Sequence, residues 1–193
     1  MSKGGGAERE VSTLLSNWWI EGRDDIFWRS DSSGARFTQR KKAGKDTANQ
    51  GGDITASDSV GEKLIKNWNI EIKSGYSSKT KVLDIKGNEK TLLNRWDVLD
   101  ILDSSQKDPV LLKMWAQCKR DADLTHREPI LIFRRNGRKL CIMFTSIYLN
   151  HLFDFFGMPS CPMVMFVIDN KSHAIFKLQD FFTWIPDIRS ALT

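Results

Sequence analysis

The stretch Trp68-Asn69-Ile70-Glu71-Ile72-Lys73 alternates apolar and polar residues, which is the period of a half-buried β-strand. On such a strand Glu71 and Lys73 point to one face, while Ile70 and Ile72 point to the other. Upstream, Gly51-Gly52 marks a tight turn into a second short strand that begins at Asp53. We therefore expect a fold in which the two strands lie together and the Asp53 carboxylate lies beside Glu71.

This arrangement would bring two carboxylates and an amine together, as the hydrolysis of a phosphodiester bond requires. Two oxygen ligands side by side suit a hard divalent cation, above all Mg²⁺. The nearby ammonium of Lys73 would orient a water or stabilise the charge that grows on a phosphate. The alternative is an exposed strand face on which Glu71 and Lys73 are only solvated.

The positive charge of the chain is concentrated around these residues. The net charge is +5, and the segment from Arg29 to Arg95 holds 14 Lys/Arg against 8 Asp/Glu. The remainder holds 15 Lys/Arg against 16 Asp/Glu, so the whole excess surrounds Asp53, Glu71 and Lys73. A basic field around a metal site suits a polyanion such as DNA or RNA, whereas the alternative is a solvated loop face.

The totals limit the class of protein. The 193 residues are enough for one α/β domain with a sizeable core. No stretch is long and apolar enough to span a membrane, and no apolar signal segment follows the start, so we expect a cytoplasmic protein with no membrane partner. Cys118, Cys141 and Cys161 are widely spaced, which indicates reduced thiols rather than a zinc site or a disulfide framework.

Apolar periodicity predicts the order of the elements. We expect helices at about 7–20, from Leu92 to Leu102, and from Asp108-Pro109 onward. Strands are predicted at 26–29, 53–56, 68–73, 129–134 and 139–144, with a long basic loop at 31–52 and a polar stretch at 74–88. A helix at 147–156, a hairpin of 164–168 and 173–178, and a helix at 180–188 follow. The prediction is a single α/β domain, 1–193, with a core at about 7–145 and a C-terminal αββα extension at about 146–193.

Several further motifs occur in a recognisable order. They are Lys3-Gly4 before Ala7-Glu8-Arg9-Glu10, Arg29-Ser30, Ser32-Ser33-Gly34, then Asp53, Glu71 and Lys73, and later Trp115-Ala116-Gln117 and Pro129 to Arg135. In this order the chain resembles the PD-(D/E)xK nuclease superfamily, with the closest likeness to archaeal-type Holliday-junction resolvases and related phage endonucleases. The likeness covers about residues 3–145. Gly52-Asp53 replaces the family's Pro-Asp, and the longer gap from Ser33 to Asp53 bears on substrate preference.

The resemblance implies a restriction-endonuclease-like αβββαβ core, with a mixed central sheet flanked by helices. It implies that Asp53 and Glu71 bind Mg²⁺, for which Mn²⁺ would substitute, and that the Ile72 backbone carbonyl is a further ligand. Lys73 would act near the attacking water, and Glu8 would reach the metal through a water. The helical period alone does not choose between Glu8 and Glu10.

Other residues are implied in DNA binding or in support of the site. Ser30 or Ser33 would hydrogen-bond a phosphate, unless both are ordinary loop caps. The basic loop would meet phosphates rather than read bases, through Arg36, Arg40, Lys41, Lys42 and Lys45. Gln117 is either an accessory residue that reaches the site from its helix or a polar residue that faces solvent.

The expected function is that of a Mg²⁺-dependent DNA endonuclease acting on branched DNA, in the cytoplasm of a bacterial or phage-infected host cell. The alternatives are a general nicking or restriction-like nuclease, a catalytically silent DNA-binding subunit, and RNA processing. Two symmetric incisions in a junction favour a homodimer. Apolar residues of the C-terminal extension either form its interface or cover the sheet: Phe153, Phe155, Phe156, Met158, Met163 and Met165.

Overall fold

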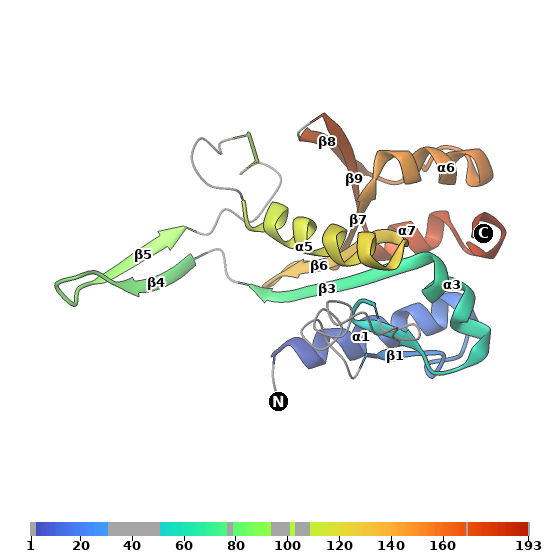
Figure 1. Cartoon of the computed structure of the whole chain (residues 1–193), viewed down its shortest axis with the longest axis horizontal. Helices are drawn as coiled ribbons and strands as arrows, with labels where there is room; N and C mark the ends of the chain where they lie inside the picture. Colours follow the sequence, from blue (N-terminus) through green and yellow to red (C-terminus); the bar gives the residue numbers. More distant parts are fainter. Residues whose placement is uncertain are drawn as a thin grey trace.

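The computed structural model of the chain describes residues 3–30, 51–76, 79–93, 101–102, 109–168 and 170–192. Its main sheet is formed by β3 (Trp68–Tyr76), β6 (Glu128–Arg135), β7 (Cys141–Thr145), β8 (Met163–Ile168) and β9 (Lys171–Lys177). The strand order is β3-β6-β7-β9-β8 (Figure 1). Strands β3 and β6 are parallel, and the other neighbours are antiparallel, so the sheet is mixed.

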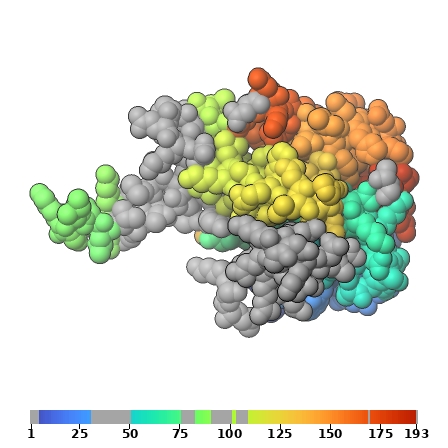
Figure 2. All heavy atoms as spheres, in the orientation of Figure 1, coloured from blue at the N-terminus to red at the C-terminus, as the bar shows by residue number. Residues whose placement is uncertain are grey.

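Helices cover both faces of this sheet. Helices α1 (Lys3–Trp19), α6 (Ser146–Phe156) and α7 (Leu178–Trp184) contribute to a large core on one face, whereas α5 (Val110–Thr125) packs on the other. In Figure 2, α5 lies across the face that is turned toward the viewer. The chain is therefore an α/β protein with a mixed sheet flanked by helices, as the sequence predicted.

The side-chain period of the strands explains the two cores. In β6, Ile130 and Ile132 belong to the core shared with α1, whereas Leu131 and Phe133 belong to the core beneath α5. Because successive residues of a strand point to opposite faces, a strand buried on both faces reads as a continuous apolar run. The run from Ile130 to Phe133 meets this requirement.

Two smaller pairs of strands lie outside the main sheet. Strand β1 (Phe27–Arg29) pairs with β2 (Ile54–Ala56), and β4 (Lys79–Leu83) pairs with β5 (Glu89–Leu93), both antiparallel. A 3₁₀ turn, η1 (Ser59–Gly61), and the short helix α3 (Glu62–Asn67) lead from β2 into β3, and a second 3₁₀ turn, η2 (Arg189–Ala191), follows α7. The β4–β5 ribbon extends away from the rest of the chain (Figure 1).

Most of the predicted elements are present, with four differences. The helix predicted from Leu92 to Leu102 is wrong at its start, where Leu92 and Leu93 lie in β5, whereas Ile101 and Leu102 at its end are helical. The stretch 74–88, expected to be a polar loop, contains the end of β3 and all of β4. The predicted helix at 180–188 is α7, which begins earlier, at Leu178, and ends at Trp184. The strand predicted at 53–56 pairs with β1 instead of joining the main sheet.

The C-terminal αββα segment is also present, and its strands β9 and β8 extend the main sheet. Three of its apolar residues pack against the core, namely Phe153, Phe156 and Met163. Phe155, Met158 and Met165 are 50%, 68% and 50% exposed. The alternative that these six apolar residues only cover the sheet is therefore correct for the first three and wrong for the last three.

The cysteines agree with the expectation from their spacing. Cys118, Cys141 and Cys161 are free thiols, and Cys118 is buried. Within the described ranges, no helix has the length and apolar character needed to cross a membrane.

Candidate active site

The Gly51-Gly52 turn brings Asp53 against the edge of β3 that is opposite β6. The Asp53 backbone N–H donates to the Ile70 carbonyl, and the Ile72 backbone N–H donates to Asp53 Oδ2, each at 2.7 Å. Gly52 has a φ of 84°, and a Cβ at this position would lie 2.6 Å from the Ile70 carbonyl oxygen. Glycine is therefore required here, both for the positive φ and for the close approach that delivers Asp53.

Glu71 and Lys73 extend from β3 toward helix α5. The Lys73 ammonium pairs with Glu71 Oε1, and Gln117 Nε2 donates to the same oxygen at 2.9 Å. Because Glu71 is only 4% exposed, the alternative of a solvated strand face is wrong for this residue. A solvent-facing Gln117 is also wrong, since its amide binds Glu71. Two donors on one buried oxygen fix the orientation of the carboxylate.

Burial and neighbouring negative charge raise the pKa of both carboxyl groups. The pKa of Asp53 rises to about 7, first because the group is buried and then because of the negative charge of Glu71. The hydrogen bond from the Ile72 N–H and the positive charge of Lys73 lower this pKa, but by less. Burial also raises the pKa of Glu71, against the opposing charge of Lys73. One ammonium does not relieve this repulsion, and a cation bound between the carboxylates would.

Glu8 and Glu10 lie on α1 but have different partners. The charge of Glu8 raises the pKa of both Asp53 and Glu71, and Glu8 Oε2 lies 3.9 Å from the Arg29 guanidinium. Glu10 instead accepts two hydrogen bonds from the Arg134 guanidinium, at 2.8 and 2.7 Å. Glu8 is thus the carboxylate of α1 that acts electrostatically on the Asp53–Glu71 pair.

Helix α5 supplies a residue that the sequence reasoning missed. Asp121 is 8% exposed and hydrogen-bonds with Gln117, and its negative charge raises the pKa of Glu71. Burial raises the pKa of Asp121 itself. The available signal was the four-residue spacing from Gln117 to Asp121, which puts both side chains on one face of a helix.

The residues expected to bind DNA are only partly described. Ser30 directly follows β1, is 8% exposed, and donates its backbone N–H to the Asp53 carbonyl at 2.8 Å. It therefore lies next to the candidate site and helps to fix its backbone. The other residues lie outside the described part of the chain: Ser33, Arg36, Arg40, Lys41, Lys42 and Lys45.

The oxygen donors around Asp53 and Glu71 are few but suit one kind of metal ion. Across the described ranges, no three Asp, Glu, His or Cys side chains converge into a ready-made metal site. However, Mg²⁺ is usually held by one or two carboxylates and completes its shell with water and substrate phosphate. Asp53, Glu71 and the Ile72 carbonyl offer only oxygen atoms, and the two carboxylates repel each other. These residues fit a hard divalent cation.

Comparison of the chain with protein-family models, with curated proteins and with solved structures finds no match.

Proposed function

We propose that the chain is a Mg²⁺-dependent endonuclease that hydrolyses phosphodiester bonds of DNA, with a restriction-endonuclease-like PD-(D/E)xK core. The observation that carries the proposal is the position of Asp53, whose carboxylate accepts the backbone N–H of Ile72 between Glu71 and Lys73. Two carboxylates and one ammonium are thereby gathered along three residues of one strand, Glu71 to Lys73, and the turn beside it. The parallel pair β3–β6 and the crossover helix α5 support the same core.

The proposed roles follow from the contacts of each residue. Asp53, Glu71 and the Ile72 carbonyl would hold the cation, and Glu8 would act on it from α1. When bound, Mg²⁺, or Mn²⁺ in its place, supplies charge neutralisation at the phosphate and lowers the pKa of a water. Lys73 pairs with Glu71, so its ammonium stands beside the carboxylate cluster and can orient the attacking water.

Gln117 and Asp121 are proposed to hold the Glu71 carboxylate in position from helix α5. Gln117 links Glu71 to Asp121 through its amide, which ties the strand carboxylate to the buried face of α5. Pre-organised groups of this kind reduce the rearrangement needed during reaction. Loss of Gln117 is expected to loosen Glu71 without removing any ligand.

The proposed substrate is DNA, and branched DNA in particular. The charge excess lies in the segment from Arg29 to Arg95, which contains Asp53, Glu71 and Lys73, and such an excess suits a phosphate backbone. We further propose that a homodimer cuts two strands symmetrically, since a twofold assembly presents two identical sites.

The test is a cleavage assay on a four-way junction, a linear duplex and single-stranded DNA with Mg²⁺, Mn²⁺ or EDTA. Wild-type protein should cut only with metal and should prefer the junction. Asp53→Asn, Glu71→Gln and Lys73→Ala should each reduce cleavage by about 10²- to 10³-fold, the range seen when a main electrostatic group is removed. Preference for linear duplex would indicate a general nicking or restriction-like nuclease. Full activity in EDTA, or in Asp53→Asn, would rule out this site, and binding without cleavage would indicate a silent subunit.

A further inference from the structure

The β4–β5 ribbon is a protruding arm with an exposed tip. Figure 1 and Figure 2 show it beyond the carboxyl end of β3, away from the two cores. All side chains from Leu83 to Lys90 are exposed, and the apolar Leu83 and Ile85 are 69% and 108% exposed. Burial of apolar side chains is the main favourable contribution to folding, and this tip buries none. Stability of the fold therefore does not explain the tip.

Hydrogen bonds within the turn hold the tip in one conformation. The Asp84 carboxylate accepts the N–H groups of Lys86 and Asn88 through Oδ1, at 2.8 and 2.9 Å, and the Asn88 side-chain amide through Oδ2, at 3.1 Å. Gly87 has the positive φ, 81°, that the turn needs. Ile85 therefore faces solvent on a fixed backbone. A side chain presented in this way loses little conformational freedom when it binds a partner.

The ribbon carries an excess of positive charge. Residues 79–93 contain four lysines and two acidic residues. The ammonium groups of Lys86 and Lys90 are exposed and form no ion pair with any residue that the structure describes. Unbalanced ammonium groups beside an apolar tip suit a partner that presents phosphates next to base edges and methyl groups. A groove of duplex DNA has this chemistry.

The size of the ribbon decides between the two grooves of DNA. Paired strands lie about 4.8 Å apart, and stacked sheets pack about 10 Å apart, which gives the thickness of a sheet with its side chains. The major groove of B-DNA is about 12 Å wide and admits a two-stranded ribbon, whereas the minor groove is about 6 Å wide. Strands β4 and β5 pair along their full length. The ribbon therefore fits the major groove, where an apolar side chain contacts thymine methyl groups.

The base of the ribbon lies close to the candidate active site along the chain. Strand β3 carries Glu71 and Lys73, and β4 begins at Lys79, six residues after Lys73. Six residues of extended chain span at most about 22 Å, which is less than one helical turn of duplex DNA, about 34 Å. A groove within one helical turn of a phosphate at Glu71 is therefore within reach of the ribbon.

We infer that the β4–β5 ribbon enters the major groove of duplex DNA, with Ile85 against the bases and with Lys86 and Lys90 on the flanking phosphates. The inference rests on the proposed function and adds to it a surface that holds the duplex next to the site. The lysines supply affinity for any sequence, and contact of Ile85 with thymine methyl groups supplies a modest sequence preference.

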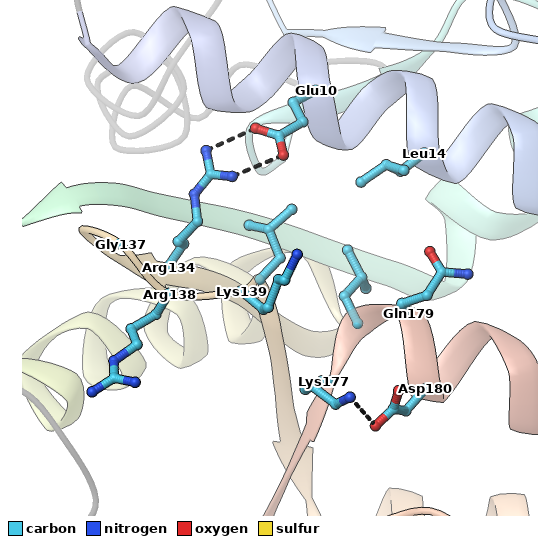
Figure 3. A pocket seen from close by; sticks show the side chains of 11 residues that line it. Glu10, Leu14, Arg134, Gly137, Arg138, Lys139, Lys177, Gln179 and Asp180 are labelled. Atoms are coloured by element: carbon cyan, nitrogen blue, oxygen red, sulfur yellow. Dashed lines mark hydrogen bonds and ion pairs between the residues drawn. The ribbon is translucent and has the colours of Figure 1, made fainter.

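The β6–β7 turn provides a matched control. It carries two exposed cations, Arg138 and Lys139, like the ribbon. Unlike the ribbon it packs on the body of the protein, because Leu140 is buried and Arg134 is held by Glu10 of α1 (Figure 3). Removal of its two cations therefore tests the effect of lost charge without any change in the ribbon.

The experiment measures affinity and chemical protection on a short duplex of mixed sequence, with Ca²⁺ in place of Mg²⁺. Wild type is compared with a variant whose residues 79–93 are replaced by a Gly-Ser linker, with Ile85→Ser, with Lys86→Ala/Lys90→Ala and with the control Arg138→Ala/Lys139→Ala. Dimethyl sulfate methylates guanine N7, in the major groove, and adenine N3, in the minor groove, so it reports which groove is covered. Thermal melts verify that each variant folds.

Wild type should protect guanine N7 and leave adenine N3 reactive, and the linker variant should lose the N7 protection. Ile85→Ser should lose about fivefold in affinity at an unchanged salt dependence, because its apolar contact is lost. The double lysine variant should lose about tenfold, and its slope of log K against log salt should fall by about 2, one unit for each lost phosphate contact. The control should keep the N7 protection and the salt slope of wild type.

Three results would overturn the inference. The first is unchanged N7 protection in the linker variant, and the second is protection of adenine N3 in place of guanine N7. The third is an equal fall of the salt slope in the double lysine variant and in the control, since net charge alone would then explain the loss.

The two proposals fail in different ways. Ribbon-dependent N7 protection by a protein that never cleaves DNA would remove the nuclease function and leave the ribbon contact. Metal-dependent cleavage with N7 protection unchanged in the linker variant would remove the ribbon contact and leave the nuclease. A wild-type protein that binds no DNA would remove both.

Discussion

At the scale of single residues, ionisation of the Asp53 carboxyl group is unfavourable in the folded protein, because the group is buried beside Glu71. Its pKa rises from an ordinary 3.8 to about 7, so the folded protein keeps a proton that the unfolded chain releases at lower pH. Stability then falls as the pH rises through this window, because the unfolded state binds fewer protons than the folded state. Carboxyl groups with strongly shifted pKa values are concentrated at functional sites, which agrees with a role for Asp53.

The Asp53→Asn variant tests this cost. Asparagine is neutral at every pH, and its carbonyl can still accept the Ile72 N–H. In metal-free buffer we expect the variant to be more stable than wild type at pH 8, by on the order of 1–3 kcal/mol, and nearly equal to it at pH 4. Thermal melts at the two pH values provide the measurement. Mg²⁺ should raise the melting temperature of the wild type and not that of the variant. A lower melting temperature for Asp53→Asn at pH 8 would contradict this account.

Glu8 and Glu10 form a matched pair for a second prediction. Glu8 acts on the Asp53–Glu71 pair, so Glu8→Gln should lower the cleavage rate by roughly 10²-fold with little change in stability. Glu10 pairs with Arg134 at a partly exposed position, so Glu10→Gln should cost at most about 1 kcal/mol and leave cleavage within about threefold. Single-turnover rates and urea titrations on both variants separate the two effects. The reverse pattern would show that the register of the resemblance is wrong.

The sequence predicted the residues of the site that depend on local pattern. Glu71 and Lys73 follow from the two-residue period of a strand, and Asp53 from the Gly-Gly turn before it. Gln117 and Asp121 were harder to place, because their role depends on how α5 packs over β3. The resemblance selected Glu8 over Glu10, whereas the partner that Glu10 has instead, Arg134, lies 124 positions away and could not be read from local pattern.

At the scale of elements, the β4–β5 ribbon contains residues whose spacing is typical of a helix but which form a strand. Leu92, Leu93 and later apolar residues have helical spacing, yet Leu92 and Leu93 pair with β4. The deciding feature is the turn, in which Asp84 Oδ1 accepts the N–H groups of Lys86 and Asn88 at 2.8 and 2.9 Å. At Leu92 and Leu93, turn chemistry therefore overrode apolar periodicity.

The same ribbon gives the third prediction. It joins neither other sheet, and Leu83 and Ile85 are 69% and 108% exposed at its end. Replacing residues 79–93 by a short Gly-Ser linker should leave the melting temperature within about 2 °C of wild type. A shift of that size corresponds to a change of less than ~1 kcal/mol in the free energy of unfolding. As a control, Ile132→Ala in the core should cost about 2–5 kcal/mol. A fall of about 5 °C or more on ribbon replacement would mean that the ribbon packs on the body.

At the scale of the whole molecule, the sheet separates the site from the C-terminal edge. β3 is one outer strand, next to Asp53, and β8 is the other. The sequence predicted the hairpin of β8 and β9 from its turn, but not which strand β9 would pair with, because that pairing joins distant segments. The pairing with β7 leaves β8 at the edge of the sheet.

This edge is where we expect the homodimer to form. Val164, Met165 and Val167 of β8 are 42%, 50% and 66% exposed, and among the described strands β8 pairs only with β9. An exposed apolar edge strand is a ready partner for a second copy, and antiparallel pairing of two such edges is twofold and keeps the two sites apart. Light scattering at micromolar concentration should therefore report twice the chain mass.

Charge on the edge strand should abolish this pairing. Met165→Lys/Val167→Lys is expected to reduce the measured mass to that of one chain, since lysine on an edge strand blocks its pairing with another. Val60→Lys/Leu124→Lys, at exposed apolar positions outside β8, is the matched control and should remain a dimer. A wild-type monomer would exclude the dimer, and a β8 variant that keeps twice the chain mass would place the interface elsewhere. If the dimer cuts both strands of a junction, the β8 variant should leave single nicks, because each chain carries one site and the second incision loses its partner.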